Sequence, residues 1–154
     1  EKGRDALASV ERHEVTPALE DVVEATIYLS GLGFENGGLA AAHAVNDGFA
    51  QEPQAHGMYH GEKVAFGTLV QLVLEKAPQE ELEQVLAFLR DTGLPLTLAQ
   101  LGVKEIVPET LKKVAEAAVV PTQSTKNLRA DITAQEVYDA ILEADRIGRD
   151  YLAH

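Results

Sequence analysis

Apolar residues recur along this chain with the 3.6-residue period of an α-helix, and that period constrains the fold more than any other feature of the sequence. Leu82, Val85, Leu86 and Leu89, for example, have the i, i+3, i+4, i+7 spacing that places four side chains on one helix face. No run alternates apolar and polar residues between turn signals, as half-buried strands do. The sequence therefore predicts an all-α fold, a bundle-like helical domain.

Start and stop signals divide the chain into predicted helices. Thr16 is a predicted N-cap with Pro17 at the first helical position, and Thr133 with Glu136 forms a predicted capping box. We expect the alanine-rich second helix to lie deep in the domain and the strongly apolar third helix to be buried. The predicted helices cover residues 16–27, 39–45, 64–74, 80–90, 111–118 and 133–151, and an exposed polar loop is predicted over 121–131.

The glycine-rich segment GLGFENG, residues 31–37, looks at first like a dinucleotide-binding fingerprint. Its last glycine comes one position too late, and a predicted helix rather than a strand precedes it, so we reject a cofactor loop. We expect Ser30, Gly31 and Gly33 to stop the first helix and Asn36 to cap the next one.

Composition limits the partners and the location of the chain. Its 25 acidic residues against 13 basic ones give a net charge of −12, which repels nucleic acid. No stretch approaches the roughly 20 apolar residues that cross a bilayer, so no membrane segment is predicted. The absence of cysteine fits a reducing cytoplasm and leaves His, Asp and Glu as the available metal ligands. We expect one domain over residues 1–154.

Histidines are the residues with the clearest chemical potential. His43 lies in the alanine-rich helix, and His60 opens the buried helix, so the two rings could converge. Neutral imidazole is the commonest ligand of zinc and similar ions. Two histidines alone are a weak metal signal, and a hydrogen-bonded core histidine is the alternative for each. His56 is a candidate for a supporting role beside them, because Gly57 makes a loop more plausible than a helix there.

Two segments, GLGFENGGLAAAHAV (31–45) and HGEKVAFGTL (60–69), resemble the bacterial glycerol dehydrogenases of the iron-containing alcohol dehydrogenase superfamily. The resemblance covers essentially the whole chain, but only the C-terminal helical domain of that family. It implies that an NAD-binding α/β domain precedes Glu1. It also implies NAD-dependent oxidation of glycerol, or a related small diol, to dihydroxyacetone or the corresponding product, with a divalent metal, usually zinc, between the two domains.

The resemblance assigns roles to particular residues. It implies that His43 and His60 are metal ligands, that Phe34 and His43 contact the substrate, and that His56 assists a proton relay or holds water. The third metal ligand of the family is an aspartate well upstream of this chain. The residues around Asp5 echo those around that aspartate, but Asp5 comes too late in the sequence, so the resemblance does not make it the third ligand. The sequence departs from its relatives at Asn36 and at Asn46-Asp47, where a serine and a His-Asn pair are usual.

Further expectations follow from the missing cofactor domain. The metal would lower the pKa of a substrate hydroxyl before hydride passes to the nicotinamide, so this chain alone should be inactive. A bared apolar face would favour a homo-oligomer. The alternative to an enzyme fragment is a non-catalytic helical assembly module without bound metal.

Overall fold

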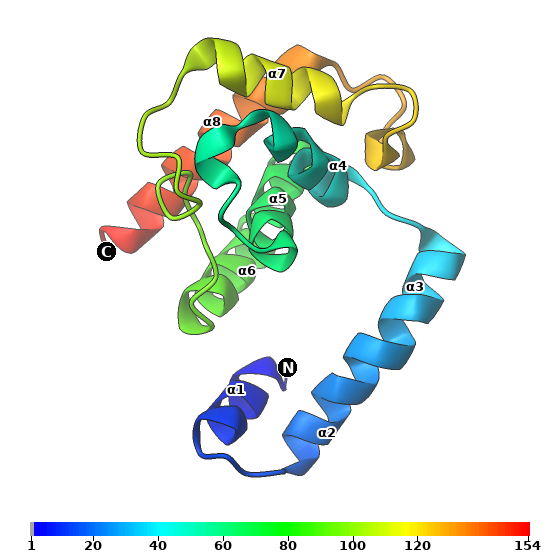
Figure 1. Ribbon diagram of the computed structural model, residues 1–154, viewed down its shortest axis with the longest axis vertical. Coiled ribbons are helices and arrows are strands. Elements are labelled where there is room, and N and C mark those ends of the chain that lie inside the picture. The colour runs from blue at the N-terminus through cyan, green and yellow to red at the C-terminus, as the bar shows by residue number, and fades with distance from the viewer. Residues whose placement is uncertain (1) are drawn as a thin grey trace. The chain divides into compact units, whose positions relative to one another are not determined.

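The computed structural model describes residues 2–154, which are helical and contain no strand (Figure 1). The all-α prediction is confirmed, and each predicted helix is present. A short helix before Thr16 was not predicted. The helices are α1 (Gly3–Glu11), α2 (Pro17–Glu24), η1 (Ala25–Leu29), α3 (Ser30–Gly37), α4 (Ala41–Gly48), η2 (Phe49–Gln51), η3 (Pro53–Ala55), α5 (His60–Glu75), α6 (Gln79–Asp91), α7 (Pro108–Ala118), η4 (Ser124–Asn127) and α8 (Ala134–Leu152).

The chain divides into two compact units, a first that ends at Gly38 and a second over Leu39–His154. In the first unit, α1 packs on α2. The buried Ser9 hydroxyl shares a 2.7 Å hydrogen bond with the Thr16 hydroxyl, which also accepts the backbone N–H of Leu19. The predicted cap at Thr16 is therefore confirmed.

One continuous helical stretch runs from Pro17 to Gly37, because η1 is a π-helical turn that joins α2 to α3. The prediction that Gly31 and Gly33 stop the helix is wrong: isolated glycines cost a helix only about 1 kcal/mol each. The prediction that Asn36 is an N-cap is also wrong, because its Nδ2 donates to the Leu32 carbonyl one turn earlier at 2.8 Å. The helix ends at Gly38, whose φ of +71° suits glycine.

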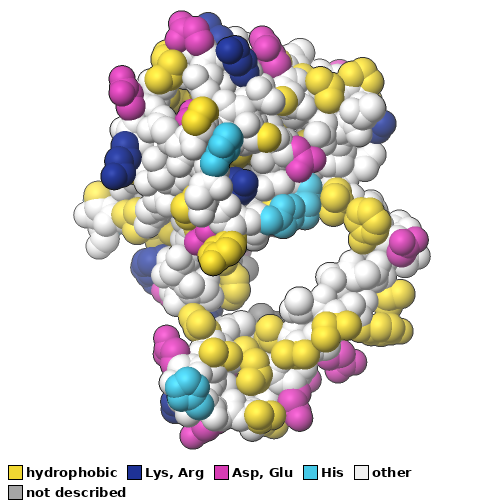
Figure 2. All heavy atoms as spheres, in the orientation of Figure 1, with side chains coloured by type: hydrophobic (Ala, Val, Ile, Leu, Met, Phe, Trp, Pro, Cys, Tyr) yellow, Lys and Arg dark blue, Asp and Glu magenta, His cyan; other side chains and the backbone are white. Residues whose placement is uncertain are grey.

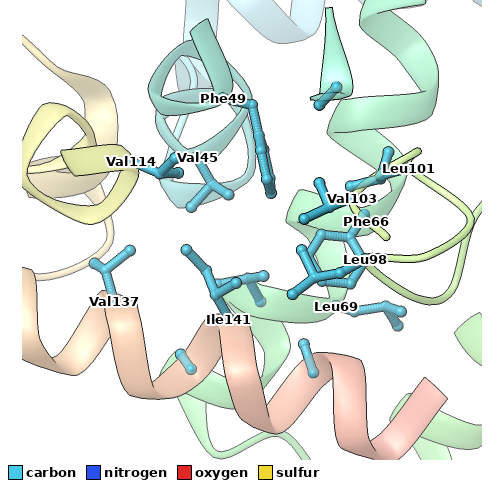
Figure 3. Close-up of a cluster of buried hydrophobic side chains, with 14 of the residues drawn as sticks. Val45, Phe49, Phe66, Leu69, Leu98, Leu101, Val103, Val114, Val137 and Ile141 are labelled. Carbon is cyan, nitrogen blue, oxygen red and sulfur yellow. The ribbon is translucent and has the colours of Figure 1, made fainter. Parts of the chain in front are cut away.

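Helices α4, α5, α7 and α8 pack around the core of the second unit, and α6 lies against α5. Figure 3 shows side chains from α4, α5, α7 and α8 and from the 94–103 segment gathered in this core. Phe49 and Phe66 contact edge to face, with ring centroids 6.1 Å apart. The predicted burial of α4 and α5 is confirmed by the side chains that are at most 1% exposed, among them Ala41, Ala44, Val45, Phe66, Leu69 and Val70.

Glycines allow backbones to touch at three helix contacts in this unit. A Cβ on Gly67 would lie 2.4 Å from the Ala42 carbonyl oxygen, and one on Gly48 would lie 2.4 Å from that of Val114. A Cβ on Gly148 of α8 would lie 2.0 Å from the Leu96 carbonyl oxygen. Helix α8 therefore meets the backbone of the 94–103 segment directly.

A buried carboxylate anchors the irregular segment between α6 and α7. Asp145 of α8 is 2% exposed, and its Oδ1 accepts the backbone N–H of Leu98 at 2.8 Å. Its Oδ2 lies 2.9 Å from the Arg149 guanidinium. A segment to which no helix is assigned is thus held as part of the core.

The 121–131 segment is more ordered than the predicted exposed loop. Thr125 is buried, and the Ser124 hydroxyl donates to the Ala40 carbonyl at 2.7 Å. Asn127 donates to the Leu39 carbonyl at 2.8 Å. The polar composition therefore serves internal hydrogen bonds that hold the start of α4. Within residues 2–154, no helix has the length and apolar character that a membrane span requires.

Candidate metal centre

His43 on α4 and His60 at the start of α5 face each other in the second unit. Their ring centroids are 5.5 Å apart and the ring planes are inclined by 47°. His43 is half-buried and His60 is exposed. Figure 2 shows histidine side chains reaching the molecular surface. The predicted convergence of the two rings is confirmed, and their role as metal ligands stays a prediction.

A local cap fixes the start of α5, where His60 lies. The Glu62 carboxylate accepts the backbone N–H of Tyr59 at 2.7 Å. A glutamate at the third helical position is the sequence signal for this contact. The cap explains why the helix begins at His60, four residues before the first apolar residue, Val64.

The environment of His43 favours a neutral imidazole. Burial lowers its pKa below the usual value of about 6.5, the adjacent His60 lowers it further, and the Asp47 carboxylate one turn along α4 opposes both effects. Asp47 is itself held by the Asn46 Nδ2 at 3.0 Å and the Gln123 Nε2 at 3.2 Å. Neutral imidazole is the form that binds a metal ion.

We expect the stability of the metal-free chain to fall as the pH drops below about 6.5. Between the lowered pKa of folded His43 and the ordinary value, the unfolded chain binds more protons than the folded chain, so protonation favours unfolding. Urea unfolding in EDTA, from about pH 5 to about pH 8, measures this slope. His43→Gln should flatten it, and an unchanged slope in that variant would assign the effect elsewhere.

Of the other predicted site residues, His56 lies in the same unit as the histidine pair, and Phe34 and Asp5 lie in the first unit. His56 is exposed, and its Nε2 lies 3.0 Å from the Ala50 carbonyl oxygen, so this ring stabilises the turn after α4. Phe34 lies on α3 in the first unit and is 56% exposed. Asp5 is an exposed residue of α1. The roles predicted for His56 and Phe34 stay predictions.

The histidine pair fits part of a metal site. Its two imidazoles face each other, and neither ring has a hydrogen-bond partner elsewhere in residues 2–154 that would occupy its nitrogens. Over the same residues, no group of three or more His, Asp or Glu side chains comes close enough to hold an ion. Within residues 2–154 the pair thus offers two candidate ligands, and a structural or catalytic zinc site takes at least three from protein.

Comparisons with known proteins give consistent matches. The chain is 55% identical over 152 residues to a glycerol dehydrogenase of Escherichia coli O6:H1, covering 99% of this chain and 41% of that protein. The structure of a probable glycerol dehydrogenase from Sinorhizobium meliloti matches with a TM-score of 0.91 and 44% identity, over 96% of this chain and 42% of the other.

A glycerol dehydrogenase structure from Schizosaccharomyces pombe matches with a TM-score of 0.93 and 40% identity, over 97% of this chain and 38% of the other. No family model matches the chain. The chain therefore spans about two fifths of the length of the relatives that it matches.

Proposed function

Since this chain corresponds in sequence and fold to the C-terminal helical part of glycerol dehydrogenases, we propose that it is the metal-binding portion of an NAD-dependent glycerol dehydrogenase. The reaction is the oxidation of glycerol, or a related small diol, to the corresponding ketone. The observation that carries the proposal is that the rings of His43 and His60 face each other where α4 contacts α5, with their centroids 5.5 Å apart.

His43 and His60 hold the ion in this proposal. The lowered pKa of His43 keeps its nitrogen available as a ligand near neutral pH. A bound divalent ion, zinc in the first instance, supplies Lewis-acid chemistry toward a substrate hydroxyl. The two imidazoles are uncharged ligands, so the charge of the ion stays available for that chemistry. A carboxylate ligand and the NAD-binding surface come from outside residues 1–154.

In this proposal the chain supplies part of the metal site. Each imidazole is fixed by its own helix, so the pair is preorganised before an ion binds. Without an NAD-binding region the chain has no hydride acceptor, and it is inactive alone. In this proposal, apolar surface that would close against the NAD-binding region also favours self-association of the isolated chain.

We expect no glycerol-dependent reduction of NAD by the chain alone and measurable reduction when it is assembled with the N-terminal region of a relative. The assay follows NADH absorbance with and without a chelator, which should abolish the activity. His60→Ala in the same assembly is the matched control.

Absence of activity in an assembly that binds both NAD and Zn²⁺ would contradict the proposal. Unchanged sedimentation of the chain after chelation, together with no activity in the assembly, would favour a non-catalytic assembly module instead.

A further inference from the structure

We propose that Gln71 is a positioning residue for the histidine pair: from α5 it caps the first turn of α4 and so sets where His43 lies relative to His60. An effect of Gln71 on metal binding rests on the function proposed above. The effect of Gln71 on the position of His43 rests only on contacts between α4 and α5.

Helix α4 begins without a cap of its own. Ala40 occupies the N-cap position and has no side chain that could accept a backbone N–H. The Gln71 Oε1, from the facing helix, instead accepts the N–H of Ala42 at 3.0 Å. Ala42 is only 9% exposed, so this N–H is largely shielded from water. A residue of α5 therefore caps α4.

The amide of Gln71 is held in the orientation that capping requires. Its Nε2 donates to the Glu75 carboxylate one turn later on α5, at 2.7 Å. Because the amide nitrogen is engaged there, the oxygen faces α4 and meets the Ala42 N–H. The pair of Gln71 and Glu75 therefore acts as one unit.

A second contact holds the same residue of α4. Gly67 lies one turn before Gln71 on α5, and a Cβ there would lie 2.4 Å from the Ala42 carbonyl oxygen. The N–H of Ala42 is hydrogen-bonded by α5 and its C=O packs against the α5 backbone at Gly67, and Ala42 directly precedes His43. Since α5 also begins with His60, one helix carries one imidazole and sets the position of the other.

Other contacts at this end of α4 come from a different segment. Ser124 and Asn127 donate to the carbonyls of Ala40 and Leu39, the two residues before the helix. They hold the entry of the chain into α4. Gln71 differs because it links the first turn of α4 to the helix that carries His60.

The test compares three variants of the 154-residue chain. Gln71→Met keeps the length of the side chain and removes the acceptor. The double variant Gln71→Glu/Glu75→Gln exchanges donor and acceptor within the pair, so an oxygen still faces the Ala42 N–H. Gln79→Met is the matched control, because Gln79 makes the same type of bond to Glu83 on α6, at 2.9 Å, without capping another helix.

Two measurements are made on each variant. NMR of the metal-free chain follows hydrogen exchange at the Ala42 amide and the cross-peak between the ring protons of His43 and His60. Visible absorption of bound Co²⁺ gives the affinity and the ligand geometry. We expect Gln71→Met to speed Ala42 exchange and to weaken Co²⁺ binding, each about tenfold, and to lose the ring cross-peak. The double variant should restore all three to within about threefold of the wild-type chain.

The outcomes separate this inference from the proposed function. If Gln71→Met keeps the cross-peak and the Ala42 exchange rate, or if Gln79→Met has the same effect, Gln71 is not a positioning residue. If the wild-type chain binds no Co²⁺ while the NMR results are as expected, the proposed function fails and the positioning of His43 stands. Loss of the fold in Gln71→Met leaves the double variant to decide, since a failure of that variant to restore the cross-peak overturns the inference.

Discussion

Replacing His43 or His60 with alanine should weaken Zn²⁺ binding at least about tenfold, because each substitution removes one of the few ligands that the chain supplies. Isothermal titration of the metal-free chain measures the effect. His56→Ala is the control, since His56 bonds to the Ala50 carbonyl, and its affinity should stay within about twofold of the wild-type value.

Unchanged affinity in both His43→Ala and His60→Ala would remove the basis of the proposed site. The absolute affinity is informative as well. With two uncharged ligands, the ion completes its coordination with water or buffer anions, so the isolated chain should bind it more weakly than an intact relative does. Affinity equal to that of an intact enzyme would mean that a further protein ligand is present.

Gly148→Ala should destabilise the second unit by at least about 2 kcal/mol. The added methyl group would lie 2.0 Å from the carbonyl oxygen of Leu96 and 2.8 Å from its carbonyl carbon, so backbone rather than a flexible side chain must move. Urea unfolding measures the loss.

Gly61→Ala is the matched control for this substitution. Gly61 is also helical, but a Cβ there would meet nothing within 4 Å, so we expect no loss and a gain of up to about 1 kcal/mol from helix propensity. Equal stability of the Gly148→Ala and wild-type chains would show that α8 and the Leu96 segment can move apart without lowering the free energy of unfolding.

Local signals predicted most of the helices correctly. The hydroxyl of Thr133 accepts the Glu136 N–H at 3.2 Å, and the Glu136 carboxylate accepts the Thr133 N–H at 2.8 Å, as the capping box predicted. Gly93 follows α6 with a φ of +73°, as expected for a helix stop. These contacts lie within a few residues of each other, which is why the sequence contains them in readable form.

The glycine-rich region was predicted less well, because a glycine costs a helix only about 1 kcal/mol and the helix can continue through it. Gly31 and Gly33 weaken a helix without ending it, and no start, stop or turn residue marks the π-helical turn over Ala25–Leu29. The backbone instead ends its helix at Gly38, where a positive φ is required. Propensity alone could not distinguish a stop from a tolerated glycine.

The sequence predicted the two candidate ligand residues of the site, but it did not predict the hydrogen bonds that hold their helices in place. His43 and His60 stood out by position and resemblance, and the structure brings their rings together. The cap that Gln71 gives to Ala42 joins residues 29 apart in sequence, and the Ser124 bond to Ala40 joins residues 84 apart. Such contacts depend on how helices pack, which helical period does not specify.

The Asp145 contact bears on the order in which this protein becomes structured. The hydrogen bond from Leu98 to Asp145 closes over 47 residues, and the 94–103 segment has no helix of its own to hold it. During synthesis that segment must wait for α8 before its buried side chains have a complete site to occupy. Leu96, Leu98 and Leu101 are buried in the folded protein, so before α8 emerges we expect them to be apolar surface, and we expect aggregation or chaperone binding to compete with folding in that interval.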